Sequence, residues 1–158
     1  MRRGAAVAAL AVVAACGGDG ESSASVVVTD AWARATPAGA TVGAVYFHVE
    51  GDGDDALVGA SVDPAIAGGV ELHMTMAVGD TSMTSVAGAG GSGEVTMHPV
   101  PEIFLPADQG VALEPGSWHL MLVDLADPLE AGETFDLTLD FASASNQVVS
   151  VDVRQDAP

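Results

Sequence analysis

The tripeptide His119-Leu120-Met121 carries the sharpest chemical signal in the sequence. On a β-strand, residues i and i+2 point to the same side, so the imidazole and the thioether would emerge together while Leu120 points the other way. Cu(I) accepts both of these ligands, whereas Mg²⁺ or Ca²⁺ would need oxygen ligands. A core methionine beside a hydrogen-bonded histidine would give the same tripeptide, so this pair alone leaves both interpretations open.

Methionine and histidine gather in one part of the chain. Apart from the initiator, every methionine lies between residues 74 and 121, and three of the four histidines lie in or directly beside that range. These methionines are Met74, Met76, Met83, Met97 and Met121. The clustering indicates a soft-metal site built from thioether and imidazole groups.

Two further His/Met pairs are adjacent in sequence, so each pair would divide between the two faces of a strand. Met74 would point away from His73 and is predicted to be core, although a strand end or bulge would make it an accessory ligand. Met97 and His98 would likewise separate, so at most one of them is a primary ligand. We interpret His98 as a surface histidine, with weak binding of Cu(II) or of a second ion as the alternative.

From residue 26 onward the sequence is typical of short strands separated by turns, with no sustained helical period. The expected strands are Val26–Thr29, Thr41–Glu50, Ala56–Val62, Val70–Met76, Glu94–His98, Val111–Leu113, Ser117–Asp124, Thr134–Phe141 and Gln147–Arg154. Many short strands at this spacing predict an all-β fold, a Greek-key β-sandwich. The segment Ala77–Gly93, rich in Gly, Ser, Thr and Ala, is predicted to be a long flexible loop.

The first 16 residues have the form of a signal peptide. Two arginines precede an uncharged Ala/Val run that is too short to span a bilayer, and the run ends at Cys16, the only cysteine. We expect Cys16 to be the lipid-carrying residue of a lipoprotein, residues 17–25 to be a flexible tether and residues 26–158 to be the folded domain. The alternative is cleavage by an ordinary signal peptidase, with an incidental cysteine.

The chain is strongly acidic, with a net charge of −18, and it contains no lysine. Loss of Arg2 and Arg3 with the leader makes the remaining chain more negative still. Such a surface repels phosphate groups, so we expect no nucleic-acid partner and contact with a membrane only through the lipid anchor.

Several stretches match a scaffold of the form AWaR, gavY, LvgA, veLH and PGxxHxML. They are Ala31-Trp32-Ala33-Arg34, Gly43-Ala44-Val45-Tyr46, Leu57-Val58-Gly59-Ala60, Glu71-Leu72-His73-Met74 and Pro115-Gly116-Ser117-Trp118-His119-Leu120-Met121-Leu122. The 21 residues between Met97 and His119 also fit the metal motif H(M)-x10-M-x21-H-x-M. On these features the chain resembles the PCuAC (DUF461) family over residues 31–154.

This resemblance implies a cupredoxin-like sandwich with His73, Met97, His119 and Met121 as copper ligands, and Met74 in the motif's optional position. One departure is an insertion: 22 residues instead of 10 separate Met74 from Met97. A surface loop lengthens at little thermodynamic cost, so the ligands can still converge. The insertion adds Met83, which we interpret as a loop residue, with an extra thioether ligand as the alternative.

The resemblance also implies a function outside the cytoplasm, in which the protein carries Cu(I) to a copper-accepting protein. The implied recipient is the binuclear copper centre of a terminal oxidase, reached directly or through an assembly factor. We expect a monomer. Two alternatives remain: a copper buffer or resistance lipoprotein, and a metal-free surface interaction module.

Other function classes lack their signatures. A blue-copper electron carrier needs a cysteine thiolate, which a lipidated chain would not offer. The sequence contains no G-x-S-x-G, H-E-x-x-H or Gly-rich phosphate motif. We therefore predict no catalytic turnover.

Overall fold

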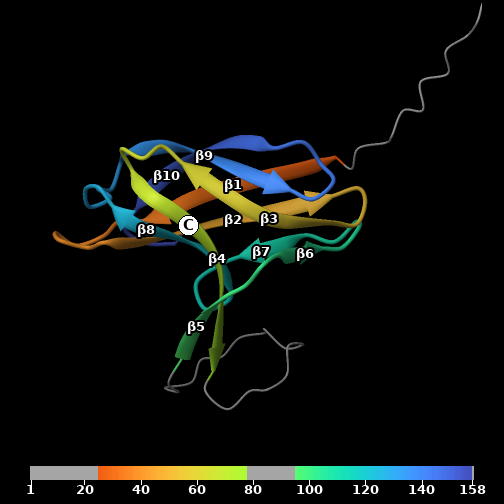
Figure 1. Ribbon diagram of the computed structural model, residues 1–158, viewed down its shortest axis with the longest axis horizontal. Coiled ribbons are helices and arrows are strands. Elements are labelled where there is room, and N and C mark those ends of the chain that lie inside the picture. The colour runs from red at the N-terminus through yellow and green to blue at the C-terminus, as the bar shows by residue number, and fades with distance from the viewer. Residues whose placement is uncertain (1–24, 78–94, 158) are drawn as a thin grey trace, which may run out of the picture.

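The computed structural model describes residues 25–77 and 95–157, which form ten β-strands (Figure 1). They are β1 Val26–Arg34, β2 Val42–Gly51, β3 Asp55–Val62, β4 Ala67–Ala77, β5 Val95–Pro99, β6 Ile103–Leu105, β7 Val111–Leu113, β8 Trp118–Leu125, β9 Thr134–Phe141 and β10 Gln147–Arg154. Within these two ranges no residue is helical, and no helix could cross a membrane. The all-β prediction is confirmed.

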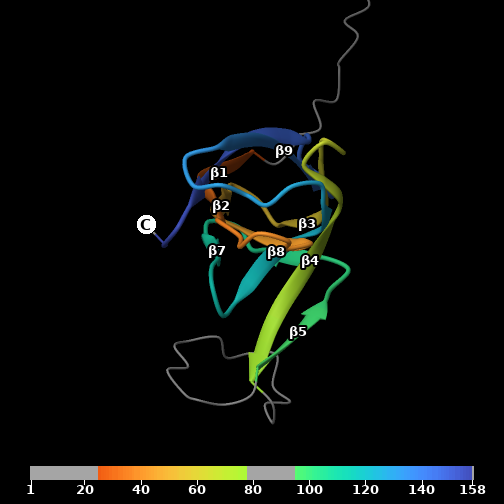
Figure 2. The same cartoon turned by 90° about the vertical axis from the view of Figure 1, so that its left-hand side faces the viewer.

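All ten strands belong to one hydrogen-bonded sheet, in the order β5-β4-β8-β7-β2-β1-β10-β9-β3-β6. Most neighbours are antiparallel, but β1 runs parallel to β10, and β7 runs parallel to β8. The sheet folds over on itself, because β3 packs against β4 although the two are far apart in the strand order. Figure 2 shows the resulting layers from the side, with β9 on one side of the body and β8 and β4 on the other.

The hydrophobic core lies between these layers and is built by strand alternation. In β9, Phe135, Leu137, Leu139 and Phe141 are buried, while the residues between them are exposed or half-buried, as the sequence predicts. In β8, Leu120 and Leu122 fill the same core. Burial of each such side chain contributes about 1.5–3 kcal/mol. The opposite face of β8 is therefore free to carry His119 and Met121.

Some strands differ from the sequence-based expectation. The sequence did not predict β6, because a strand of three residues is too short to show a period. β1 continues five residues past Thr29, where the alternation breaks. β4 begins at Ala67, three residues before the predicted start at Val70. The sequence missed these residues because the glycines at positions 68 and 69 weaken the strand signal.

The break in β1 is a β-bulge. Thr29 pairs with His48, and Trp32 pairs with Tyr46. Two residues of β1 therefore lie between these pairs where β2 has one, so β1 contains one extra residue. Asp30 adopts φ 53°, a left-handed conformation that aspartate tolerates better than most residues. The extra residue turns Trp32 to the face of Tyr46 and turns Ala33 into the core.

Strands β4 and β5 form an antiparallel arm that projects from the body (Figures 1 and 2). β4 is 11 residues long, and its second half pairs with β5 from His73↔Pro99 to Ala77↔Val95. The predicted loop lies between these strands. Its residues 78–93 are outside the described residues, as are the predicted leader, Cys16 and nearly all of the tether.

A buried carboxylate joins the start of β3 to the turn after β9. Asp55 accepts hydrogen bonds from the backbone N–H groups of Ala56 (2.8 Å), Ser143 (2.9 Å) and Ala144 (2.8 Å). Burial alone would raise the pKa of Asp55, but the backbone donors outweigh burial and hold the pKa below its ordinary value. The ionised form is therefore the one that stabilises the fold.

Replacing this carboxylate should weaken the fold. In Asp55→Asn, an NH₂ group replaces one acceptor oxygen and faces a backbone donor, so we expect a loss of about 2–3 kcal/mol in the free energy of unfolding. The wild-type contribution is full above the unfolded-state pKa of about 3.9, and it is lost as the pH falls through the lowered folded-state pKa. Urea unfolding across this acid range should show a shallower loss of stability in the variant. Asp136→Asn, an exposed change on β9, is the matched control, and equal stability of both variants would contradict the assignment.

Candidate metal centre

Two imidazoles lie directly opposite each other on neighbouring strands. His73 of β4 pairs with His119 of β8, and their ring centroids are 5.8 Å apart. Both side chains occupy the outer face, since Leu72 and Leu120, the pair next to them, point into the core. The two histidines are nevertheless buried, with 7% and 2% of their surface exposed. Sequence alternation predicted the face of each ring, but not that the two rings would meet.

A hydrogen bond to the backbone carbonyl of Ser117 sets the tautomer of His119. The carbonyl of Ser117 can only accept, so Nδ1–H of His119 donates to it at 3.1 Å. The same carbonyl accepts the N–H of Thr75, which ties it to β4. In the neutral ring, Nε2 then carries a lone pair, and this atom is buried and has no hydrogen-bond partner.

Electrostatics keep His119 in this neutral form. Burial lowers the pKa of His119 below its ordinary value of 6.5, and the nearby His73 lowers it further. The hydrogen bond to Ser117 acts in the opposite direction without reversing the shift. An unprotonated nitrogen is the form that binds a metal ion.

His73 has the complementary arrangement. Its Nε2–H donates to the Glu71 carboxylate, with 2.9 Å between Nε2 and Oε2, and its Nδ1 is buried without a hydrogen-bond partner. Each ring thus has one nitrogen that is hydrogen-bonded and one that is not. Buried polar atoms are nearly always paired, so one unpaired nitrogen on each of two facing imidazoles suits the binding of a metal ion. A metal ion would satisfy both.

The two predicted thioether ligands belong to the same face of the sheet. Met121 lies two residues beyond His119 and pairs with Glu71, and it is half-buried. Met97 pairs with Thr75 across the arm, so it shares the face of His73 and is 51% exposed. All four predicted ligands therefore lie on one face of three adjacent strands, β5, β4 and β8.

The accessory candidates divide as strand alternation predicts. Met74 is buried and pairs with both Trp118 and His98, on the face opposite His73. His98 is exposed on that same opposite face. Met83 lies outside the described residues. The ligand assignment itself stays a prediction.

Sequence reasoning missed an aromatic wall beside the histidines. Tyr46 lies 6.4 Å from His119 and 4.7 Å from Trp32, measured between ring centroids, and both aromatic residues are buried. Burial raises the pKa of the Tyr46 phenol, partly offset by the charge of Arg34. The tripeptide Ala31-Trp32-Ala33 gave no hint of this position, because the bulge in β1 decides which way Trp32 points.

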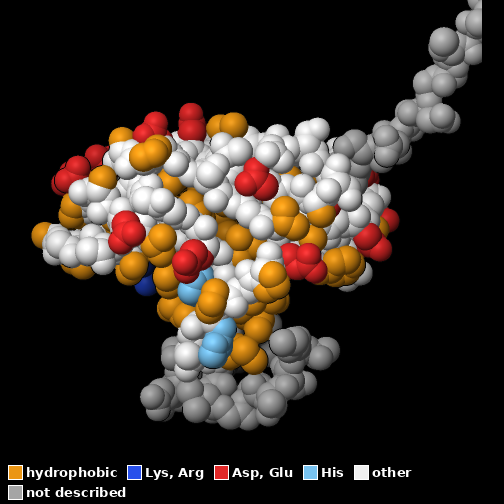
Figure 3. All heavy atoms as spheres, in the orientation of Figure 1, with side chains coloured by type: hydrophobic (Ala, Val, Ile, Leu, Met, Phe, Trp, Pro, Cys, Tyr) orange, Lys and Arg blue, Asp and Glu red, His pale blue; other side chains and the backbone are white. Residues whose placement is uncertain are grey.

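The donor set is soft rather than hard. Among residues 25–77 and 95–157, no group of three or more His, Cys, Asp or Glu side chains could hold a metal ion. Imidazole and hydrophobic side chains gather where the arm leaves the body, whereas the carboxylates are scattered over the surface (Figure 3). This distribution disfavours Ca²⁺ or Mg²⁺, and it suits an ion that accepts nitrogen and sulfur.

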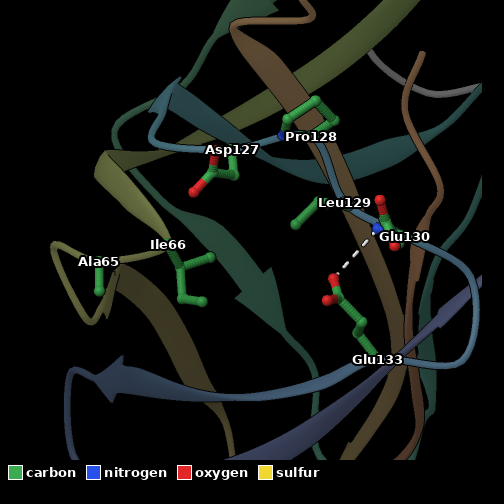
Figure 4. A pocket seen from close by; sticks show the side chains of 7 residues that line it. All are labelled: Ala65, Ile66, Asp127, Pro128, Leu129, Glu130 and Glu133. Carbon is green, nitrogen blue, oxygen red and sulfur yellow. Dashed lines mark hydrogen bonds between the residues drawn. The ribbon is translucent and has the colours of Figure 1, made fainter. Parts of the chain in front are cut away.

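A hollow of about 400 Å³ lies elsewhere on the molecule (Figure 4). The turn before β4 and the loop between β8 and β9 form it, and none of the predicted ligands lines it. Glu133 points across it and accepts a hydrogen bond from the backbone N–H of Glu130. This contact gives Glu133 a role in shaping the loop.

Comparisons with known proteins agree with this architecture. The family model described as "Putative lipoprotein LpqE-like" matches residues 26–153. A relative from Leifsonia xyli subsp. xyli, "Putative lipoprotein Lxx21020", is 30% identical over 136 residues, which is 85% of this chain and 73% of the relative.

Solved structures with a similar fold include two PCuAC domains. The copper-bound PCuAC domain from PmoF2 has a TM-score of 0.62 at 23% identity, over 83% of this chain and 93% of that one. The apo PCuAC domain from PmoF1 has a TM-score of 0.61 at 26% identity, over 84% and 94%. The solution structure of CuI-DR1885 from Deinococcus radiodurans has a TM-score of 0.57 at 27% identity, over 80% and 76%. The predicted cupredoxin-like fold is confirmed.

Proposed function

Since the chain belongs to the LpqE-like family and has the fold of PCuAC domains, we propose that it is a copper chaperone that binds Cu(I). The observation that carries this proposal is the pair of facing imidazoles, each with one buried and unpaired nitrogen. We assign Nε2 of His119, Nδ1 of His73 and the sulfur atoms of Met97 and Met121 as the ligands. The related domain from PmoF2 binds copper and DR1885 binds Cu(I), which supports copper as the ion.

Cu(I) fits this donor set for physical reasons. It is a soft d¹⁰ ion that prefers polarizable sulfur and accepts neutral imidazole. Thioethers carry no proton at any relevant pH and do not form disulfides, so they hold the ion where thiols would be oxidised. The lowered pKa of His119 keeps its nitrogen available for the ion near neutral pH.

The graded exposure of the ligands supports a role in transfer. The two imidazoles are buried in the sheet and Met121 is half-buried, but Met97 stands half-exposed on the projecting arm. A ligand group from a partner would reach copper first on this side and replace the Met97 thioether. The ion would then stay coordinated throughout the exchange. The protein would carry copper without catalysing a reaction.

The finer assignments follow from the sequence. We propose that the chain is exported and carries a lipid at Cys16. It would then be anchored to the outer face of the cytoplasmic membrane, or lie in the periplasm. The description of its family and of its relative as lipoproteins supports this proposal. We propose a terminal oxidase, or one of its assembly factors, as the recipient of copper. A monomer suffices for this role, because one chain supplies all four proposed ligands.

His119 and Met121, the two proposed ligands on β8, can be tested together. Replacing both His119 and Met121 by Ala removes two of the four ligands and should abolish high-affinity Cu(I) binding. The measurement is a Cu(I) competition titration of the chain lacking residues 1–16, which keeps all ten described strands. His48→Ala, an exposed histidine on β2, is the control and should bind like the wild type. Unchanged affinity in the double variant would refute the site, provided urea unfolding shows that it is folded.

A second prediction concerns the exposed ligand. Met97→Ala should weaken Cu(I) binding by about tenfold, equivalent to about 1.4 kcal/mol. It should also speed the release of copper to a small chelator, because the first bond to break is already absent. Thr96→Ala, on the other face of the arm, is the matched control. Stopped-flow transfer rates that are the same for Met97→Ala and for the wild type would contradict Met97 as the exit ligand.

A protein that delivers copper and a protein that buffers copper predict different phenotypes when the gene is deleted. If the protein delivers copper, deleting its gene should lower oxidase activity at limiting copper, and added copper should restore the activity. The measurement is oxygen consumption of membranes across a series of copper concentrations. Loss of copper tolerance with normal oxidase activity would instead indicate a buffer or resistance protein.

A further inference from the structure

We propose that Glu71 is a positioning residue of the copper site, which holds His73 through a hydrogen bond and thereby strengthens the bond from the opposite ring nitrogen to copper. This inference rests on the proposed function and deepens it. It adds to the four-ligand set a fifth side chain that acts on a ligand rather than on the ion.

The geometry places Glu71 for this task. Its carboxylate lies 2.9 Å from Nε2 of His73, two residues along the same strand and therefore on the same face. It also pairs directly with Met121 on β8, so it neighbours two of the proposed ligands. Its side chain is 53% exposed, while that of His73 is 9% exposed, so the carboxylate contacts the ring from the solvent side.

The two histidines are held by different means. Nδ1 of His119 donates to the backbone carbonyl of Ser117, an arrangement that no side-chain substitution at Ser117 would remove. His73 is held by a side chain, so its orientation and donor strength depend on residue 71. A carboxylate that accepts from the far nitrogen of a metal-bound imidazole fixes its tautomer and raises its basicity.

Glu71 acts through His73 and is not itself a ligand. In the described part of the chain, no group of three or more His, Cys, Asp or Glu side chains could hold a metal ion, so Glu71 and the two histidines do not form such a group. The hydrogen bond to Nε2 also occupies one carboxylate oxygen.

A conservative and a non-conservative substitution test the proposal. Glu71→Ala removes the hydrogen bond and should weaken Cu(I) binding by about 10–100-fold in the competition titration. Glu71→Gln keeps an acceptor oxygen for Nε2–H and should stay within about threefold of the wild type. Asp136→Asn makes the same charge change on β9 and should have no effect. Wild-type affinity in Glu71→Ala, or an equal loss in Glu71→Gln, would overturn the proposal.

A measurement without copper separates this inference from the proposed function. Long-range ¹⁵N NMR of the metal-free protein at mildly alkaline pH should show His73 protonated at Nε2, with this state retained in Glu71→Gln and averaged between tautomers in Glu71→Ala. A wild-type ring protonated at Nδ1 would overturn the role of Glu71, even if copper binds as proposed. If the wild type binds no Cu(I), the proposed function fails and the positioning role toward copper fails with it, whatever the ring tautomers are.

Discussion

The register between β4 and β8 is the constraint on which the site depends. It sets His73 against His119 on the outer face, and it sets Leu72 against Leu120 in the core. A slip of one residue would turn His73 inward and Leu72 outward, because side chains alternate along a strand. The apolar pairs that stabilise the fold therefore also fix the distance between the imidazoles. Packing and the proposed metal binding cannot be separated in this part of the sheet.

The site has a stability cost that the rest of the sheet offsets. Two buried nitrogens without a hydrogen-bond partner, one on His73 and one on His119, each cost about 1–3 kcal/mol. The aromatic wall and the hydrogen bonds to Glu71 and Ser117 hold the rings in place despite this cost. Bound copper would satisfy both nitrogens, so the protein is expected to gain stability with its cargo.

Much of the fold, but only part of the site, could be predicted from the sequence. Alternation correctly separated Met74 from His73 and His98 from Met97, because it depends on local geometry alone. The contact between the histidines, and the pairing of Glu71 with Met121, depend on which strands are neighbours, which alternation does not show. Only the resemblance to the PCuAC family implied that both histidines belong to one site. Trp32 was missed for another reason: a single left-handed residue, Asp30, shifts the side of the sheet to which Trp32 points.

The long insertion can be understood from the arm. The chain has 22 residues between Met74 and Met97 where the family motif has 10, yet the pairs from His73↔Pro99 to Ala77↔Val95 are formed. Cross-strand hydrogen bonds thus fix Met97 relative to His73, whatever the length of chain that joins the far ends of the two strands. Loop closure becomes only slowly less favourable with length. The position of Met97 on the face of His73 therefore does not depend on the length of the loop.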